Sequence, residues 1–297
     1  MANLRDIRRR IKSVKNTAQI TRAMQLVAAA KMKKAQDQAL AGRDYADLLN
    51  QVLVNLKEKV NEEAHPLLEQ REGEGKELIL VVSTDKGLCG ALNTNLGKKV
   101  RAEAPDADVV SVGRKLRTSL GKAGRTMVAD FEVKDPVPFA EARPIAKLLT
   151  QLFLDGKYDK VSIAFTNFVS TLNQEPTIVP LLPIRAETLG EKLDFEGVGQ
   201  EVAETDREAA LSKDYLFEPS AEGVLDALLP LYVNFQVYQT LVESRASEHS
   251  ARMVAMKAAT DNANKFIKEL TLEYNKLRQA AITAELLEIT TAMKAME

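Results

Sequence analysis

Three sets of residues have types or spacing that could support chemistry: a glycine-containing turn, two histidines and one cysteine. The turn at 85–90 (DKGLCG) follows an apolar run, a place where α/β sheets often bind their ligands. Its glycines, Gly87 and Gly90, lack the spacing of a phosphate-binding or dinucleotide-binding loop. A tight turn from a strand into a helix, in which glycine supplies backbone freedom, is the better interpretation.

Histidine and cysteine are too sparse in this chain for the usual metal or nucleophile sites. His65 and His249 are the only histidines, and neither lies near carboxylates or thiols at metal-ligand spacing. Cys89 is the only cysteine, which excludes an internal disulfide and predicts a small buried thiol. No Ser/His/Asp or Cys/His order is recognisable. We therefore expect no catalytic residue, no bound cofactor and no metal site.

The first 34 residues form a basic arm on a chain whose net charge is only -1. They carry ten Lys or Arg side chains and one acidic side chain, Asp6. Positive charge near a helix N-terminus opposes the helix dipole, so the basic run at 8–15 points to a partner, with a solvated face as the alternative. The first 44 residues contain no aromatic side chain, so an acidic protein surface is favoured over nucleic acid. A coiled-coil adaptor that docks through this arm is the alternative function.

Both ends of the chain have the composition of very long helices. All ten prolines lie between Pro66 and Pro230, and the first 65 and last 67 residues contain one glycine, Gly42. Both ends repeat seam residues in alternating steps of three and four, which is typical of a left-handed coiled coil. The predicted seam runs over 4–60 and 225–284; near the chain ends it comprises Leu4, Ile7, Ile11, Val14, Ala18, Thr21, Gln25, Ala28, and Met253, Met256, Thr260, Ala263, Ile267, Leu270, Tyr274, Leu277, Ala281, Ala284.

These helices are too long for a compact domain. At the usual rise per residue, 3–60 would span about 85 Å and 231–293 about 95 Å, so part of the coiled coil must project. Ser220, behind Pro219, predicts a helix start. Pro230 predicts a kink, or a helix that restarts after it.

Between the helical ends, short apolar runs alternate with helical segments. The expected strands are 77–84, 108–113, 126–133 and 160–169, and the expected helices are 91–103, 114–122 and 139–154. Apolar strands between helices indicate a Rossmann-like α/β domain with a mainly parallel sheet covered on both faces. The acidic stretch 186–214 is expected to be a solvated connection.

The predicted fold class is therefore α/β, combined with a coiled coil of the two terminal helices. The expected domains are an N-terminal coiled-coil helix (1–65), an α/β domain (66–215) and a C-terminal coiled-coil helix (216–297). No apolar run approaches the ~20 residues needed to span a bilayer.

Four stretches of the sequence are too particular for a generic coiled coil. They are IRRRIKSVKNTAQITRAMQLVAAAKM at 7–32, STDKGLCGALN at 83–93, ASEHSARMVAMKAATDN at 246–262 and YNKLRQAAITAEL at 274–286. Together they resemble the gamma subunit family of F-type ATP synthases, of the bacterial type, along nearly the whole chain.

The resemblance implies a rotor. The terminal helices would form an antiparallel coiled coil inside a hexamer of alternating alpha and beta subunits, and the α/β domain would contact the epsilon subunit and the ring of c subunits. Proton flow would turn ring and shaft, and the asymmetric shaft would drive the catalytic beta sites through different conformations. The chain would thus transmit torque without catalysing, as a peripheral protein on the cytoplasmic face of the bacterial plasma membrane.

The resemblance also implies which residues meet these partners. The expected alpha and beta contacts are Met24, Arg252, Arg278, Gln279 and Thr283, to which charge adds Arg8 and Arg9. Residues 214–219 (DYLFEP) resemble the family segment at the c-ring end, which makes Tyr215 and Glu218 the expected contacts of the c-ring and epsilon. The regulatory cysteine pair of chloroplast relatives is absent.

Overall fold

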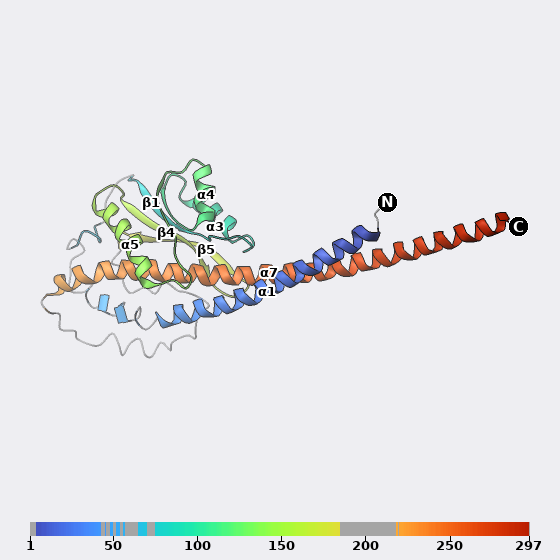
Figure 1. Ribbon diagram of the computed structural model, residues 1–297. Coiled ribbons are helices and arrows are strands. Elements are labelled where there is room, and N and C mark those ends of the chain that lie inside the picture. Colours follow the sequence, from blue (N-terminus) through green and yellow to red (C-terminus); the bar gives the residue numbers. More distant parts are fainter. Residues whose placement is uncertain are drawn as a thin grey trace. The chain divides into compact units, whose positions relative to one another are not determined.

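The computed structural model describes residues 4–42, 45, 48, 49, 52, 53, 56, 65–69, 75–184, 218 and 220–296. In chain order its elements are α1 (Leu4–Ala41), β1 (Glu77–Val82), α3 (Leu92–Glu103), β2 (Asp108–Val112), α4 (Arg114–Lys122), β3 (Met127–Phe131), α5 (Phe139–Leu154), β4 (Lys160–Phe168), β5 (Gln174–Leu182) and α7 (Ala221–Met296) (Figure 1). The chain divides into two compact units, Met1–Ala28 with Met253–Glu297, and Ala29–Arg252.

The smaller unit is a two-helix coiled coil made by the start of α1 and the end of α7. From 4 to 28 and from 253 to 281, every predicted seam position is buried or half-buried, and nearly every position between them is exposed. Ile7 and Ala28 are 2% exposed, and Leu270 is 5% exposed. The start of α1 and the end of α7 point to the same end of this unit, so the two helices run antiparallel (Figure 1). The predicted seam is therefore confirmed here.

A polar contact crosses the seam of this coiled coil. The hydroxyl oxygens of Thr21 and Thr260 lie 2.7 Å apart, and both residues are buried. A polar pair inside an apolar seam loses its hydrogen bond when the helices slip, so it favours one register. The two threonines therefore specify how the helices are aligned.

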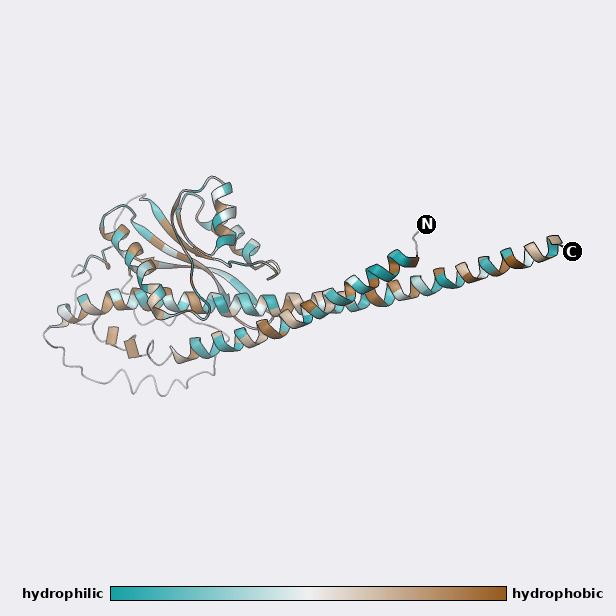
Figure 2. Cartoon of the chain, viewed as in Figure 1, coloured by the Kyte–Doolittle hydropathy of each residue, from teal (hydrophilic) through white to brown (hydrophobic). Residues whose placement is uncertain are grey.

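The end of α7 extends past the part of the seam that is buried. From 282 to 296 every residue of α7 is exposed, so the last predicted seam position, Ala284, does not belong to the buried seam. Several of these residues are apolar, and Figure 2 shows apolar positions continuing to the end of the helix. The exposed apolar residues are Ile282, Leu286, Leu287, Ile289, Met293 and Met296.

The larger unit contains a five-stranded sheet of order β3-β2-β1-β4-β5. Strands β1 to β4 pair in parallel, and β5 joins the edge antiparallel to β4. The mainly parallel sheet predicted from the sequence is confirmed. Strand β5 was not predicted, because Pro176 and Pro180 interrupt its pattern; a proline without an N–H is tolerated at a sheet edge.

Each face of the sheet packs on its own helices. Leu80 and Val110 belong to a core shared with α5 and α7, whereas Ile79 and Val109 belong to a core shared with α3 and α4. Side chains alternate between the faces of a strand, so a strand covered on both sides must be apolar throughout. Strand β1 meets that requirement, since it is buried from 78 to 82.

Helix α7 begins at Ala221, ten residues before the 231–293 stretch whose length was estimated from the sequence. The Ser220 hydroxyl accepts the N–H of Gly223 at 3.1 Å, which confirms the predicted helix start. The helix then runs through Pro230, so the restart after this proline, one of the two expected outcomes, is wrong, and the kink stays a prediction. Leu229 and Val233 are fully buried on either side of the proline, and this packing holds the helix together despite the lost backbone hydrogen bond.

Helix α1 ends at Ala41, and part of the expected 3–60 helix lies outside the described residues. Of the later seam positions, Leu49, Leu53 and Leu56 are buried in the larger unit's core. The expected connection at 186–214 also lies outside the described residues, and the domain boundaries at 65 and 215 stay predictions.

Candidate functional site: the polar segment of α7

Helix α7 is buried along a stretch that is mostly polar. The buried polar residues between 236 and 250 are Gln236, Gln239, Thr240, Glu243, Ser244, Arg245, Ser247, Glu248, His249 and Ser250. A buried charge is costly unless partners replace the water it loses, so this stretch requires partners from the rest of the unit. The charged residues and their neighbours, here called the polar network, are Lys31, Asp85, Asp135, Arg245, Glu248, His249 and Arg252.

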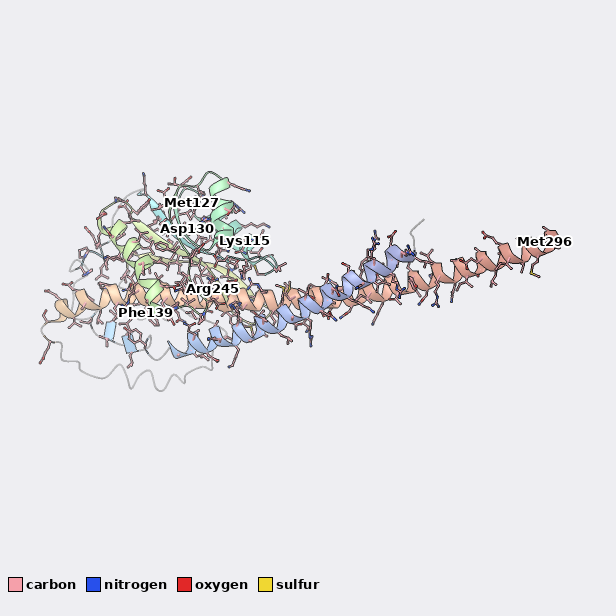
Figure 3. The ribbon with its side chains drawn as sticks, viewed as in Figure 1. Lys115, Met127, Asp130, Phe139, Arg245 and Met296 are labelled. Atoms are coloured by element: carbon pink, nitrogen blue, oxygen red, sulfur yellow. The ribbon has the colours of Figure 1, made fainter. Side chains whose placement is uncertain are left out.

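Arg245 lies at the centre of the polar network, on α7 alongside the sheet (Figure 3). Its Nη1 donates to Glu248 Oε2 at 2.7 Å, its Nη2 donates to the Val133 carbonyl at 2.8 Å, and Nη2 lies 3.4 Å from Asp85 Oδ2. The side chain is 10% exposed. Burial alone would lower the pKa of Arg245, but Glu248 and the two aspartates raise it, so the guanidinium is charged at neutral pH.

Glu248 connects Arg245 to Arg252. Its second oxygen accepts Arg252 Nη2 at 2.7 Å, and the same nitrogen lies 3.4 Å from the carbonyl of Gly87 in the turn after β1. The carboxylate thus bridges two guanidinium groups on one helix. Arg252, an expected partner contact, is 12% exposed and is engaged within the chain.

Asp135 brings α1 and α7 to the loop between β3 and α5. Lys31 Nζ donates to Asp135 Oδ2 at 2.7 Å, and His249 Nε2 lies 3.2 Å from the same oxygen, although its alignment is poor for a hydrogen bond. The contact with His249 and then that with Lys31 hold the pKa of Asp135 well below its usual range, despite partial burial. Arg252 Nη1 lies 3.4 Å from His249 Nδ1, so the imidazole of His249 lies between Arg252 and Asp135.

The polar segment of α7 forms hydrogen bonds with the strand ends at the topological switch point of the sheet. Strands β1 and β4 are neighbours, while the chain leads from β1 outward to β2 and β3, and a doubly wound fold binds nucleotides where the strand order reverses in this way. Here Glu243 accepts the N–H of Phe168 at the end of β4, at 3.0 Å, and Arg245 contacts Asp85 just after β1. The chain's own helix therefore supplies the polar groups that meet these strand ends.

The turn that follows β1 is a structural turn, as its sequence predicts. The side chain of Asn93 accepts the Thr84 N–H at 3.2 Å and donates to the Thr84 hydroxyl at 2.8 Å. Gly90 has a positive φ of 61°, as expected, but the other residue with a positive φ is Leu88, at 66°, and not Gly87 as expected; leucine rarely adopts this conformation. Cys89 is buried, as expected, beside the Asn93 amide.

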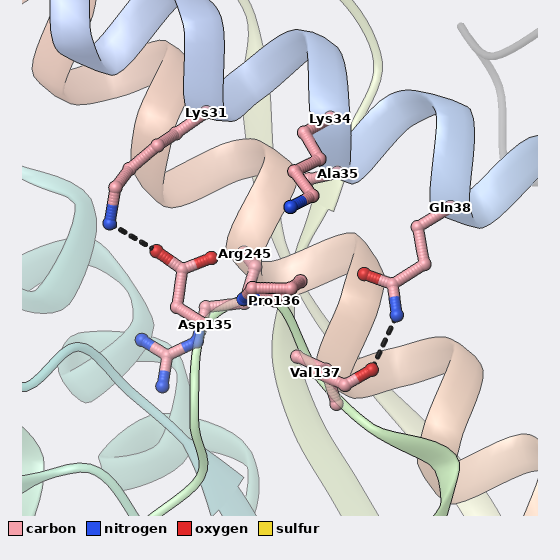
Figure 4. Close-up of a pocket in the computed structure, with 8 residues that line it drawn as sticks. All are labelled: Lys31, Lys34, Ala35, Gln38, Asp135, Pro136, Val137 and Arg245. Atoms are coloured by element: carbon pink, nitrogen blue, oxygen red, sulfur yellow. Dashed lines mark hydrogen bonds and ion pairs between the residues drawn. The ribbon is translucent and has the colours of Figure 1, made fainter.

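A small cleft of about 200 Å³ lies beside the network. Its lining residues are Lys31, Lys34, Ala35, Gln38, Asp135, Pro136, Val137 and Arg245 (Figure 4). Gln38 donates its amide to the Val137 carbonyl and to the hydroxyl of Tyr238, at 3.0 Å for the latter. The cations beside the cleft are mostly paired, because Lys31 bonds Asp135 and Arg245 bonds Glu248. The cleft therefore belongs to the packing interface between α1, α7 and the loop after β3.

The expected partner contacts lie in different places. Arg8, Arg9, Arg278, Gln279 and Thr283 are exposed in the smaller unit, where Met24 is half-buried. Glu218 is exposed in the larger unit, and Tyr215 lies outside the described residues. Arg245 and Asp135, which hold the polar network together, were not singled out from the sequence. The only signal in the sequence was that Arg245, a charged residue, directly precedes an apolar seam position, Ala246.

Neither histidine belongs to a metal cluster in the described part of the chain, where no group of three His, Cys, Asp or Glu side chains could hold an ion. His65 Nδ1 accepts the Leu67 N–H at 3.0 Å, and its Nε2 lies 3.6 Å from Asp226. Burial lowers the pKa of His65, and Asp226 opposes this only in part. None of the helices in the described residues is long and apolar enough to cross a membrane.

The fold and the polar network define a class of protein: a two-helix coiled coil whose long C-terminal helix is anchored by buried charges in an α/β domain. Solved structures share this fold. A chain of the Euglena gracilis mitochondrial ATP synthase (OSCP/F1/c-ring, rotational state 3) matches with a TM-score of 0.68 at 23% identity, over 99% of this chain and 94% of that one. A chain of the rotor of the same enzyme, in rotational state 1, gives 0.65 at 20% identity, over 94% and 98%.

Sequence comparison identifies the family. A family model described as ATP synthase matches residues 3–296. The ATP synthase gamma chain of Akkermansia muciniphila is 50% identical over 100% of both chains, and that of Opitutus terrae is 50% identical over 98% of both. The chain therefore belongs to the ATP synthase gamma chain family, as its sequence motifs predicted.

Proposed function

We propose that this chain is the central shaft of a proton-translocating F-type ATP synthase and carries torque between a membrane ring of c subunits and a hexamer of alternating alpha and beta subunits. The observation that carries this proposal is the end of α7, which is helical, partly apolar and exposed from 282 to 296. An isolated amphipathic helix end gains little stability in water, since most helical stability comes from packing. A protein sleeve would supply that packing.

The surface of the coiled coil supports rotation within such a sleeve. Its exposed positions mix polar residues with scattered apolar ones, such as Ile20, Leu26 and Phe266. Single exposed polar contacts contribute only ~1 kcal/mol or less, so each can be exchanged as the shaft turns. On this surface Met24, Arg8, Arg9, Arg278, Gln279 and Thr283 are the proposed contacts with alpha and beta. Arg252, in the larger unit, is also a proposed contact, through the 12% of its side chain that is exposed.

The other end of the shaft would meet the membrane part of the complex. Glu218 is exposed just before α7 begins, and together with Tyr215 it is proposed to contact the c-ring and epsilon. In this arrangement the chain associates with the membrane through the ring, on the cytoplasmic face of the bacterial plasma membrane. The bacterial relatives support that location.

Co-expression with the alpha and beta subunits of the same organism tests the proposal. Native mass measurement should find one copy of the chain per three alpha–beta pairs, and ATP hydrolysis should depend on its presence. The double variant Leu286→Asn, Ile289→Asn should weaken this association, whereas the control Glu285→Gln, Glu288→Gln in the same turns should not. Failure of the wild-type chain to associate would contradict the proposal.

The same preparation separates this function from an adaptor that docks through its basic arm. A phosphate-binding arm would give DNA affinity that falls steeply with salt. We expect the purified chain to show no such binding, because the basic residues at 8–15 are proposed to face protein surfaces.

A further inference from the structure

The side chain of Arg245, on α7, bonds two separate loops of the α/β domain. Its guanidinium reaches the Val133 carbonyl, in the segment after β3, and Asp85, in the turn after β1. Glu248 holds the guanidinium from the other side, on α7 itself. A single side chain thus ties the helix to the carboxyl-terminal ends of two strands.

The cost of burying this charge indicates a role beyond stability. An apolar residue of similar size would fill the same space without losing hydration, and replacing a buried ion pair by apolar residues is often neutral or stabilising. The neighbouring seam positions are of this apolar kind, since Val242 and Ala246 are apolar and fully buried. A buried arginine instead fixes the orientation of the helix that carries it, because the hydrogen-bond donors of its planar guanidinium are satisfied in only one arrangement.

Directional hydrogen bonds are needed where a helix must not rotate or slide on the sheet against which it packs. Apolar contacts such as those among Phe165, Leu241 and Val242 are non-directional, so a small rotation of α7 about its axis exchanges one contact for another at little cost. The same rotation would separate Arg245 from both loops at once. Lys31 and His249 on Asp135 add a second tie to the segment after β3, from two helices.

We propose that Arg245 is a positioning residue that locks α7 to the α/β domain, so that torque applied to the domain turns the helix without slip. This inference rests on the proposed shaft function. The lock consists of Arg245 with Asp85 and the Val133 carbonyl, braced by Glu248. It acts through the rigidity of the shaft and touches neither nucleotide nor the transported ion.

The test uses the assembled membrane complex and three variants. Arg245→Met keeps the length of the side chain but removes its donors, Arg245→Lys keeps the charge, and Asp85→Asn removes the charge on the loop side. The matched control is Arg125→Met, because Arg125 also donates to two carbonyls, those of Ala104 at 2.8 Å and Ala107 at 3.1 Å, both within the α/β domain. ATP hydrolysis, ATP-driven proton pumping and amide hydrogen exchange at 83–90 are measured for each.

The lock predicts a specific pattern. Arg245→Met should accelerate exchange at 83–90 by about 100-fold, since removing one partner of a buried charged pair leaves the other unpaired. It should lower the protons pumped per ATP while hydrolysis continues. Arg245→Lys should restore part of the pumping. Arg125→Met should change neither the exchange at 83–90 nor the pumping ratio.

Each contrary result has a defined meaning. If the wild-type complex does not pump, the shaft function itself fails. If it pumps and Arg245→Met pumps with the same ratio, or if Arg125→Met is equally impaired, the lock is overturned while the shaft function stands. Should Arg245→Met fail to assemble, Asp85→Asn decides: a normal pumping ratio overturns the lock, and a lowered ratio with continued hydrolysis supports it.

Discussion

Gly113 is a residue at which a close approach between two segments demands glycine. Its φ is 87°, and a Cβ there would lie 2.3 Å from the carbonyl oxygen of Ser83. The Ser83 hydroxyl in turn bonds the carbonyls of Val112 and Gly113, both at 3.1 Å. The start of the turn after β1 therefore packs closely against the end of β2, which helps to place Asp85 within 3.4 Å of Arg245.

Gly113→Ala should destabilise the chain by about 2 kcal/mol or more, because the new methyl group meets backbone and the positive φ is strained. Urea unfolding of the purified chain measures this change. Gly121 is the matched control: it lies in α4, and a Cβ there meets nothing within 4 Å. Gly121→Ala should stabilise by roughly 0.5–1 kcal/mol. Equal effects at the two positions would contradict the close approach at Gly113.

Tyr158 is a buried residue whose ionisation should be visible at high pH. Its hydroxyl donates to Asp108 Oδ2 at 2.8 Å, and burial together with this carboxylate raises the pKa of Tyr158 to about 12. A raised pKa means that the fold favours the neutral phenol. That stabilisation is complete below the unfolded pKa of about 10 and is lost as the pH rises toward 12.

The expected result is a loss of unfolding free energy between pH 10 and 12 that is absent in Tyr158→Phe, with a size of at most about 2–3 kcal/mol. Unfolding by urea at several alkaline pH values, with tyrosinate absorbance recorded in parallel, measures both quantities. Tyr45 is half-exposed and serves as the control, so Tyr45→Phe should leave the alkaline loss unchanged. An identical pH profile for Tyr158→Phe and the wild-type chain would refute the role of Tyr158.

At the scale of elements, periodicity determines most of what could be predicted. The seam at 4–28 and 253–281 and strands β1 to β4 follow directly from apolar spacing, because each has a face that must be buried. Strand β5 was missed since its two prolines oppose a strand locally, and only pairing with β4 stabilises it. The polar network was missed for a related reason: its partners, such as Arg245 and Asp85, lie far apart in the sequence.

The coiled coil offers a test of which face of α7 holds the element together. Leu270 is 5% exposed and Leu272 is 59% exposed, so two leucines almost adjacent in sequence differ in burial. Leu270→Ala should lower the stability of the smaller unit by about 2–3 kcal/mol, near the low end for buried leucines because the seam is narrow. Leu272→Ala should change it by less than about 0.5 kcal/mol.

Hydrogen exchange of amides in 256–281 in the purified chain measures this difference locally. Exchange should accelerate in Leu270→Ala and stay near the wild-type rate in Leu272→Ala. In the assembled complex the order of effects on subunit association should reverse, because Leu272 faces outward. If both variants behave alike in the purified chain, the seam is wrongly assigned.

At the scale of the whole molecule, the chain combines two kinds of interaction. Inside each unit the contacts are directional or tightly packed: the threonine pair across the seam in one unit, and the polar network around Arg245 in the other. On the outside of the coiled coil the residues are exposed and chemically mixed. A shaft needs this division, because its inner contacts must resist torque while its outer contacts must exchange during each turn.

Met24→Lys tests the outer contacts, because it places a new charge at a proposed contact with beta. An ion pair between this lysine and a carboxylate of the sleeve would favour one rotational position by up to ~1 kcal/mol. That is enough to slow each step about fivefold. ATP-driven proton pumping should therefore fall more than assembly does, and the loss should lessen at high salt, which screens exposed charges.

Ala23→Lys is the matched control, since it adds the same charge one residue away, at an exposed position about 100° around the helix. The pumping rate of this control should stay closer to that of the wild-type complex. If the two lysine variants pump equally slowly, the effect reflects charge in general and Met24 has no special contact with beta. If Met24→Lys pumps normally at low salt, the outer face near Met24 does not bear on the sleeve, and the contact surface on α1 must be sought elsewhere.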